Sequence, residues 1–161
     1  SMNYDSLIMK IFIQYGSFTV HVGLPDGPPS ETDALDVMEA HHLMEWSAGA
    51  FLIATGMQVG ELTLNLTMLN EQPPLASLEE NQELDEVTFR PNGTALVVIG
   101  FDMSEPVSEV LPHSATGLYR ARLIATGRET DASDPSETYS LEFWPVADLE
   151  PRRTERVRHR P

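Results

Sequence analysis

The chain has 161 residues with 25 acidic and ten basic side chains, a net charge of −15 at neutral pH, and no cysteine. This length fits one domain, and a hydrophobic content of 41% excludes a globally disordered chain. The absence of cysteine excludes disulfide bonds and thiolate metal sites. The acidic excess argues against binding to nucleic acid or to anionic lipid, because contacts with phosphate groups need Lys and Arg.

The charge is distributed unevenly along the chain. Residues 150–161 hold five basic and two acidic side chains, whereas residues 1–149 hold five basic and 23 acidic ones, so the body carries −18 and the tail +3. We expect a single domain over residues 1–149, followed by a basic tail that is flexible unless it docks on the acidic body. No apolar run approaches the roughly 18 residues of a membrane span and no leader pattern opens the sequence, so we expect a cytoplasmic protein with no membrane contact.

Alternating apolar residues open the chain and predict two strands, at about residues 8–14 and 17–22. Ile11, Ile13 and Tyr15 share one parity of the first pattern, and the same alternation continues in the second. A loop rich in Pro and Gly follows, because these residues set the backbone and remove hydrogen-bond donors.

One α-helix is predicted over about residues 33–47. Asp33 is a suitable N-cap for it, acidic residues are frequent in its first half, and Gly49 ends the pattern. Strand patterns then return for the rest of the body, at residues 50–55, 60–69, 83–91, 94–102, 117–129 and 137–146.

These elements predict a mainly β protein: an antiparallel β-sandwich of about eight strands with the helix as an insertion at one end or edge. Asn92 and Gly93 lie between two of the predicted strands and are typical of a tight hairpin turn. Residues 70–82 read as a long acidic loop, and residues 103–116 as an irregular connection.

The stretch LEENQELDE, residues 78–86, gathers five carboxylates with no basic residue beside them. A solvated loop tolerates such a cluster, but a negative surface also steers a basic partner. Acidic residues of the predicted helix extend this surface, and a Trp at its end offers an aromatic anchor. The candidate partner-binding residues are therefore Asp33, Asp36, Glu39, Trp46, Glu79, Glu80, Glu83, Asp85 and Glu86.

An alternative site lies in the stretch EAHHLMEW. On a helix, His41 and Glu45 point the same way and can share a divalent metal with His42 nearby, but further ligands would have to come from His21, His113 or a distant acid. The simpler interpretation is that His42 is partly buried and His41 is solvated. The sequence has no nucleophile elbow, P-loop or dinucleotide fingerprint, so we expect no catalytic residue and no cofactor.

Arg120 and Arg122 stand at alternate positions of a predicted strand, in a body with only five basic residues. They are expected to line the solvent face of the sheet and to pair with Glu142 on the neighbouring strand. Trp144, at the end of that strand, is expected to anchor the core.

Several segments together carry a family resemblance. IQYGSFTVHVG, EWSAGAFLIAT, GELTLNLTML and the ending GLYRARLIATGRE…ETYSLEFWP resemble the competence-protein-J family, over residues 8–145 in outline and chiefly at Tyr15, Phe18 and Val20. Members of that family are small acidic inhibitors of the DNA-entry nuclease in competent bacteria. The resemblance implies an inhibitor or immunity protein, and it implies no catalytic residues.

The sequence therefore favours an acidic, non-enzymatic protein that binds and neutralises a basic partner, with a bacterial nuclease or toxin as the first candidate. Two alternatives stay open. One is a metal- or ligand-binding β-sandwich enzyme that uses His41, His42 and Glu45. The other is a structural or interaction domain whose basic tail contacts nucleic acid or folds back on the body; the tail arginines are Arg152, Arg153, Arg156, Arg158 and Arg160. The sequence does not fix the oligomeric state.

Overall fold

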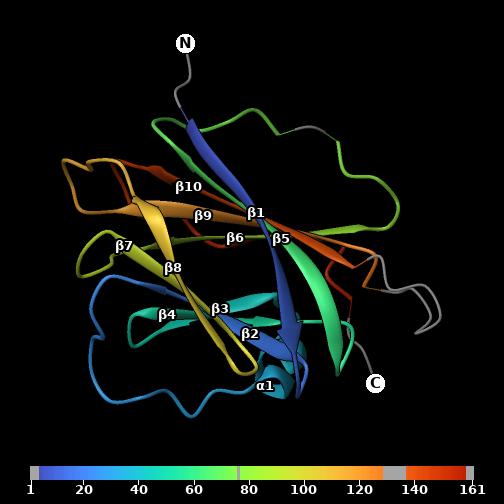
Figure 1. Ribbon diagram of the computed structural model, residues 1–161. Helices are drawn as coiled ribbons and strands as arrows, with labels where there is room; N and C mark the ends of the chain where they lie inside the picture. Colours follow the sequence, from blue (N-terminus) through green and yellow to red (C-terminus); the bar gives the residue numbers. More distant parts are fainter. Residues whose placement is uncertain (1–3, 76, 129–136, 159–161) are drawn as a thin grey trace.

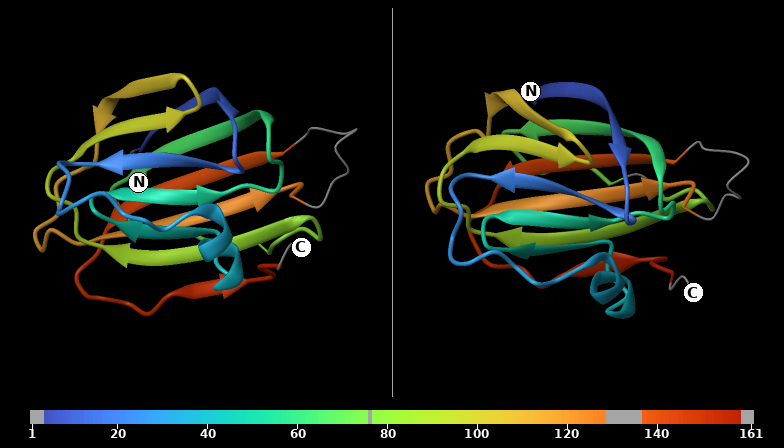
Figure 2. Two further views of the ribbon diagram at one scale, coloured as in Figure 1. Left: turned by 90° about the horizontal axis from the view of Figure 1, so that it is seen from below. Right: turned by 60° about the horizontal axis from the view of Figure 1, so that its bottom comes forward.

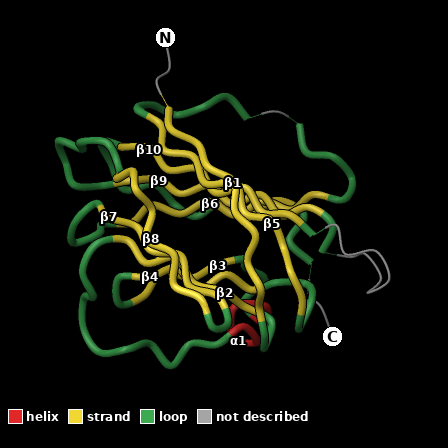
Figure 3. The backbone as a smooth tube through the Cα atoms, in the orientation of Figure 1, coloured by secondary structure: helices red, strands yellow, loops and turns green. Residues whose placement is uncertain are grey.

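The structure is a computed structural model that describes residues 4–75, 77–128 and 137–158. Two β-sheets stack face to face, and a short helix lies at one end (Figures 1 and 3). The predicted class, a mainly β sandwich dominated by antiparallel pairing, is confirmed. In the described ranges no helix combines the length and the apolar character that a membrane crossing requires.

The larger sheet, sheet A, has the strand order β1-β5-β10-β9-β6-β11. Its neighbouring strands are antiparallel except for β5 and β10, which run parallel. The strands are β1 (Tyr4–Ile13), β5 (Gly60–Leu69), β6 (Gln82–Phe89), β9 (Tyr119–Thr126), β10 (Thr138–Pro145) and β11 (Arg153–Glu155).

The smaller sheet, sheet B, has the order β3-β4-β2-β7-β8 and is antiparallel throughout. Figure 2 shows it stacked on sheet A, with the only helix of the described residues beside it. The elements are β2 (Ser17–Val22), α1 (Ala34–Glu39), β3 (Met44–Ser47), β4 (Ala50–Ala54), β7 (Ala95–Gly100) and β8 (Met103–Val110).

The core lies between the two sheets and follows the alternation of the sequence. Ile11 and Ile13 of β1 and Val20 of β2 are fully buried, as are their counterparts on the central strands. Burying one face of each strand removes apolar area from water, and this is the main stabilising contribution. All eight predicted strands are present, and the described residues add β3, β8 and β11.

The predicted helix over residues 33–47 is wrong beyond Glu39. Asp33 caps the helix as expected, and Asp36 completes a capping box, but the helix ends at Glu39, and His41 adopts a left-handed φ of 58°. The chain then enters β3, where Met44 is fully buried and Trp46 packs at the sheet. A long-range contact decides the change, because Met44 N–H donates to a buried carboxylate on β6, which a helical pattern cannot reveal.

The predicted hairpin at Asn92 and Gly93 is also wrong. β6 belongs to sheet A and β7 to sheet B, so this turn carries the chain from one sheet to the other. The turn is held by Leu24, whose N–H donates to the Asn92 carbonyl at 2.8 Å, and by Gly23, which donates to Ala95 at 2.8 Å. β7 pairs with β2 and β8 instead, and β8 forms the edge of sheet B within the segment expected to be irregular.

Candidate functional site

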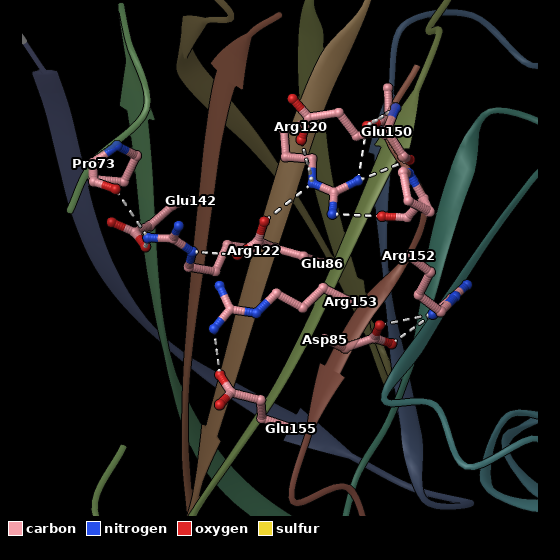
Figure 4. A network of polar contacts seen from close by, with 12 residues as sticks. Pro73, Asp85, Glu86, Arg120, Arg122, Glu142, Glu150, Arg152, Arg153 and Glu155 are labelled. Atoms are coloured by element: carbon pink, nitrogen blue, oxygen red, sulfur yellow. Dashed lines mark hydrogen bonds and ion pairs between the residues drawn. The ribbon is translucent and has the colours of Figure 1, made fainter. Parts of the chain in front are cut away.

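A buried ionic network lies on the face of sheet A that points away from the core (Figure 4). Glu86 of β6 accepts from Arg120 Nε at 3.1 Å and from Arg122 Nε at 2.7 Å. All three side chains are at most 5% exposed. Two arginines on the neighbouring strand therefore share one carboxylate.

The segments that flank this network bury it. Arg120 donates to the carbonyls of Glu150 and Pro151 at 3.1 and 2.9 Å, and Arg122 donates to the carbonyl of Pro73 at 3.4 Å. The expectation that the two arginines line a solvent face is therefore wrong. The loop before β6 and the segment after β10 both fold over them, and each supplies main-chain acceptors to guanidinium groups that would otherwise be costly to bury.

Glu142 and Trp144 of β10 complete the network beside Arg122. The predicted pairing of Arg122 with Glu142 is confirmed at 3.7 Å, and the guanidinium lies 4.9 Å from the centre of the Trp144 ring. Trp144 is buried as expected. Burial raises the pKa of Glu142 above its ordinary value, and the positive charge of Arg122 offsets only part of this effect.

A second cluster joins the two sheets through Arg152. Its guanidinium reaches both carboxylate oxygens of Asp85 on β6, Glu45 Oε2 on β3 at 3.0 Å and the Met44 carbonyl at 3.2 Å. Asp85 also accepts from the N–H groups of Leu43 and Met44, at 2.9 and 3.2 Å. Burial raises the pKa of Asp85, although Arg152 and the two N–H groups act in the opposite direction.

A third cluster lies at the end of β9. Arg128 pairs with Glu83 at 2.8 Å, and both side chains are at most 1% exposed. Glu137 accepts from the Tyr139 hydroxyl at 2.6 Å and from Met57 N–H at 3.1 Å. Desolvation, followed by the negative charge of Glu137, raises the pKa of Tyr139 well above its ordinary value. These bonds tie β10 to the loop between β4 and β5.

The structure divides the nine candidate partner-binding residues by exposure: three are buried, one is half-buried and five are exposed. Glu83, Asp85 and Glu86 are buried and bound to arginines, so they do not belong to an exposed binding surface, contrary to the expectation. The arginines that neutralise them are distant in sequence, which is why the stretch looked uncompensated. Trp46 is half-buried, with its ring centre 4.8 Å from those of Phe51 and Phe89, so it mainly packs against the core.

The other five candidates are exposed. Asp33, Asp36 and Glu39 lie on or beside α1, and Glu79 and Glu80 lie just before β6. The tail brings positive charge close to the last two, because two tail arginines donate to their carbonyl oxygens at 2.6 and 3.3 Å, namely Arg156 to Glu79 and Arg158 to Glu80. The described part of the tail, residues 150–158, is therefore docked on the body and contributes β11 to sheet A.

The alternative metal site depended on a helix that includes His41, His42 and Glu45, and the helix ends before these residues. His41 and Glu45 do not share a helix face, because the helix ends before His41; instead His42 Nδ1 contacts Glu45 Oε1. Glu45 also binds Arg152, as described above. Within residues 4–75, 77–128 and 137–158, no three His, Cys, Asp or Glu side chains are grouped so as to hold a metal ion. A pocket of about 210 Å³ on the outer face of sheet B has Glu45 and His21 in its lining, together with several hydroxyl groups.

The residues outside the buried clusters remain strongly acidic. Four acids and three arginines are buried: Glu83, Asp85, Glu86 and Glu137 with Arg120, Arg122 and Arg128. The rest of the chain holds 21 acids and seven bases, a net charge of −14, after these are removed from the totals of 25 and ten. The interior is thus nearly neutral, and the excess negative charge is left to the remaining residues.

The chain was compared with protein families, curated proteins and solved structures, and only the solved structures gave matches. No protein-family model and no curated protein matches the chain. A similar solved structure is that of ComJ from Bacillus subtilis, an inhibitor of the DNA-degrading activity of NucA; it is 18% identical, with a TM-score of 0.62, over 89% of this chain and 99% of ComJ. Another is a protein named Crocagin biosynthetic gene J, 16% identical with a TM-score of 0.48, over 91% of this chain and 99% of that one. The resemblance predicted from the sequence is therefore confirmed in three dimensions, and this chain has the fold of ComJ.

Proposed function

We propose that this protein is a non-enzymatic inhibitor that binds a nuclease and blocks it. The observation that carries the proposal is the shared fold, because ComJ, matched over 99% of its length, inhibits the DNA-degrading activity of NucA. An inhibitor needs a rigid surface rather than a reactive group. The three buried ionic clusters supply such rigidity, since each joins strands or loops that are distant in sequence.

The surface charge supports a basic partner. A nuclease that holds DNA presents Lys and Arg to the phosphates, so its substrate groove carries positive potential. The residues outside the buried clusters carry −14, and opposite potentials accelerate association and disfavour wrong partners. We assign long-range attraction to the five exposed candidates, Asp33, Asp36, Glu39, Glu79 and Glu80.

The test is a nuclease assay with purified proteins. The chain is titrated into NucA of Bacillus subtilis and into purified nucleases of the source organism, with cleavage of fluorescent double-stranded DNA as the readout. We expect saturable inhibition that weakens steeply as salt rises from about 50 mM to about 300 mM, because exposed charges are screened.

An unrelated acidic protein of similar size and charge serves as the control for simple competition with DNA. Inhibition by this control at the same concentration would mean that charge alone produces the effect. Full activity of every nuclease at a large excess of the chain would refute the proposal.

A further inference from the structure

Four exposed apolar residues lie in or beside three turns that meet at one end of the molecule, and we call this group the aromatic end: Phe12, Tyr15, Val59 and Phe101. The β1–β2, β4–β5 and β7–β8 turns lie side by side in Figures 1 and 2. Hydrogen bonds join them directly, because Gly16 N–H donates to the Gln58 carbonyl at 3.0 Å and Phe101 N–H to the Phe12 carbonyl at 2.9 Å. The rings of Phe12 and Phe101 are 6.2 Å apart.

Tyr15 is the residue of this group that the fold explains least. It occupies a two-residue turn closed by Gln14 and Ser17, with φ of 68° at Tyr15 and 72° at Gly16. Such turns favour Asn, Asp or Gly, because a left-handed backbone is strained for a bulky side chain. The Tyr15 ring is 75% exposed, so little packing offsets that strain. A strained residue without a packing role indicates a function outside the fold.

Three acidic side chains lie beside the aromatic end. Glu61 stands opposite Phe12 in the β1–β5 register, Asp102 follows Phe101 directly, and Glu105 lies on the edge strand β8; all three are exposed. An apolar centre with a charged rim is the usual anatomy of a protein-binding surface. The negative rim selects a positively charged partner, and the exposed rings accept Arg or Lys by cation–π contact.

The two exposed acidic regions that hold the five candidate residues lack these properties. The carboxylates of Asp33 and Asp36 are engaged in capping α1, and the backbone of Glu79 and Glu80 is bound by tail arginines. Both regions have a charge to offer, but neither combines it with a group of exposed aromatic rings. They suit long-range attraction, whereas the aromatic end suits close contact.

We infer that the aromatic end is the surface on which the nuclease docks, with Tyr15 as the anchor against a basic patch of the partner. This inference rests on the proposed function and deepens it. The strain at Tyr15 then has a specific consequence, namely that the residue which strengthens binding weakens the fold.

The experiment uses Tyr15→Asn in the nuclease assay described above, with NucA and any source nuclease that the wild-type chain inhibits, and with the melting temperature as a second readout. Asn tolerates the left-handed turn and removes the ring. We expect the inhibition constant to rise about tenfold or more, while the melting temperature rises by about 2 °C. Leu149→Asn is the matched control, because Leu149 is 74% exposed and lies in the C-terminal segment; it should leave the inhibition constant unchanged.

A charge variant tests the rim separately. Asp102→Asn combined with Glu61→Gln should slow association and reduce the salt dependence of inhibition, with little change in dissociation. Unchanged inhibition by Tyr15→Asn, when the wild-type chain inhibits, overturns the docking surface and leaves the proposed function standing. Absence of inhibition by the wild-type chain overturns both. A wild-type dimer that Tyr15→Asn converts to a monomer would show that the surface binds a second copy of the chain, and would also overturn the inference.

Discussion

Arg152 donates through Nη1 to both carboxylate oxygens of Asp85, at 2.8 and 2.7 Å, although 67 residues separate the two in sequence. Asp85 is fully buried on β6, whereas Arg152 enters from the C-terminal segment and is about a quarter exposed. The same guanidinium binds Glu45 on β3, so one side chain connects the tail to both sheets. The basic tail is thus part of the folded body, and much of its charge acts within the molecule.

Removing Arg152 should cost more stability than removing its neighbour. Arg152→Ala leaves the buried Asp85 carboxylate with two N–H donors and no counter-charge, and we expect a loss of about 2–4 kcal/mol in the free energy of unfolding. Arg153→Ala breaks a surface pair with Glu155 and should cost less than about 1 kcal/mol. Urea denaturation of both variants measures the difference. Equal losses would contradict a stabilising role for the contacts of Arg152 with Asp85 and Glu45.

Two glutamates of the same acidic stretch should respond in opposite ways. Glu86→Gln leaves Arg120 and Arg122 buried without their shared carboxylate, and we expect a loss of about 3 kcal/mol or more. Glu79→Gln removes an exposed charge from a strongly acidic surface and should leave stability unchanged or slightly higher. Chemical denaturation at neutral pH is again the measurement. A tolerated Glu86→Gln would mean that hydrogen bonds rather than charge hold the two arginines.

The pKa of Glu142 predicts a pH effect with a definite sign. Burial raises this pKa above its ordinary value of 4.5, so the folded state holds the proton more tightly than the unfolded chain. Glu142 therefore contributes stability that is fully present below pH 4.5 and is lost as pH rises through the pKa of the folded state. In Glu142→Gln this titration is absent, so the free energy of unfolding, variant minus wild type, should increase from about pH 4 to about pH 7.

The measurement for this prediction is a series of urea midpoints at stepped pH for both proteins. Glu61→Gln, on an exposed part of the neighbouring strand, removes one carboxylate without removing a buried one and controls for the change in net charge. A difference between Glu142→Gln and wild type that stays flat or falls with pH would contradict the predicted sign.

Two glycines with a left-handed backbone should differ because of their surroundings. A Cβ on Gly23, with φ of 74°, would lie 2.6 Å from the backbone of Asn92, at the point where the chain crosses between the sheets. A Cβ on Gly27, with φ of 101°, would meet open space. We expect Gly23→Ala to cost about 3 kcal/mol or more and Gly27→Ala about 1–2 kcal/mol, since only the first adds a backbone clash to the strain. If the melting temperatures of the two variants fall equally, the backbone at Asn92 moves aside at little cost in free energy, and the predicted difference is wrong.

The sequence predicts the strands well because half-buried strands leave a period of two in the sequence. It fails where a distant contact decides the outcome. Leu43 and Met44 leave the helical pattern because their N–H groups bind Asp85, 42 and 41 residues further on. The hairpin at Asn92 fails for a related reason, since a favourable turn sequence does not reveal which sheet each flanking strand joins.

The candidate site was predicted less well than the fold. The acidic stretch has no basic residue close to it in sequence, so the sequence indicates exposed carboxylates. In the folded chain, distant arginines pair with them, namely Arg120, Arg122, Arg128 and Arg152. Tyr15 shares the parity of the buried Ile13, so alternation assigns it to the core, whereas the turn reverses the chain one residue earlier and exposes the ring. The signal for that turn was the glycine at position 16.

The strand order of sheet A sets the timing of folding during synthesis. β10 fills the position between β5 and β9, and β11 closes the far edge, yet both are made after every other strand of the sheet. During synthesis, the facing edges of β5 and β9 therefore stay unpaired until β10 has emerged from the ribosome as far as Pro145. Asp85 meets its counter-charge, Arg152, later still. Open strand edges invite pairing with other chains. Newly made copies are thus most vulnerable to aggregation after β9 has emerged and before β10 and β11 join the sheet.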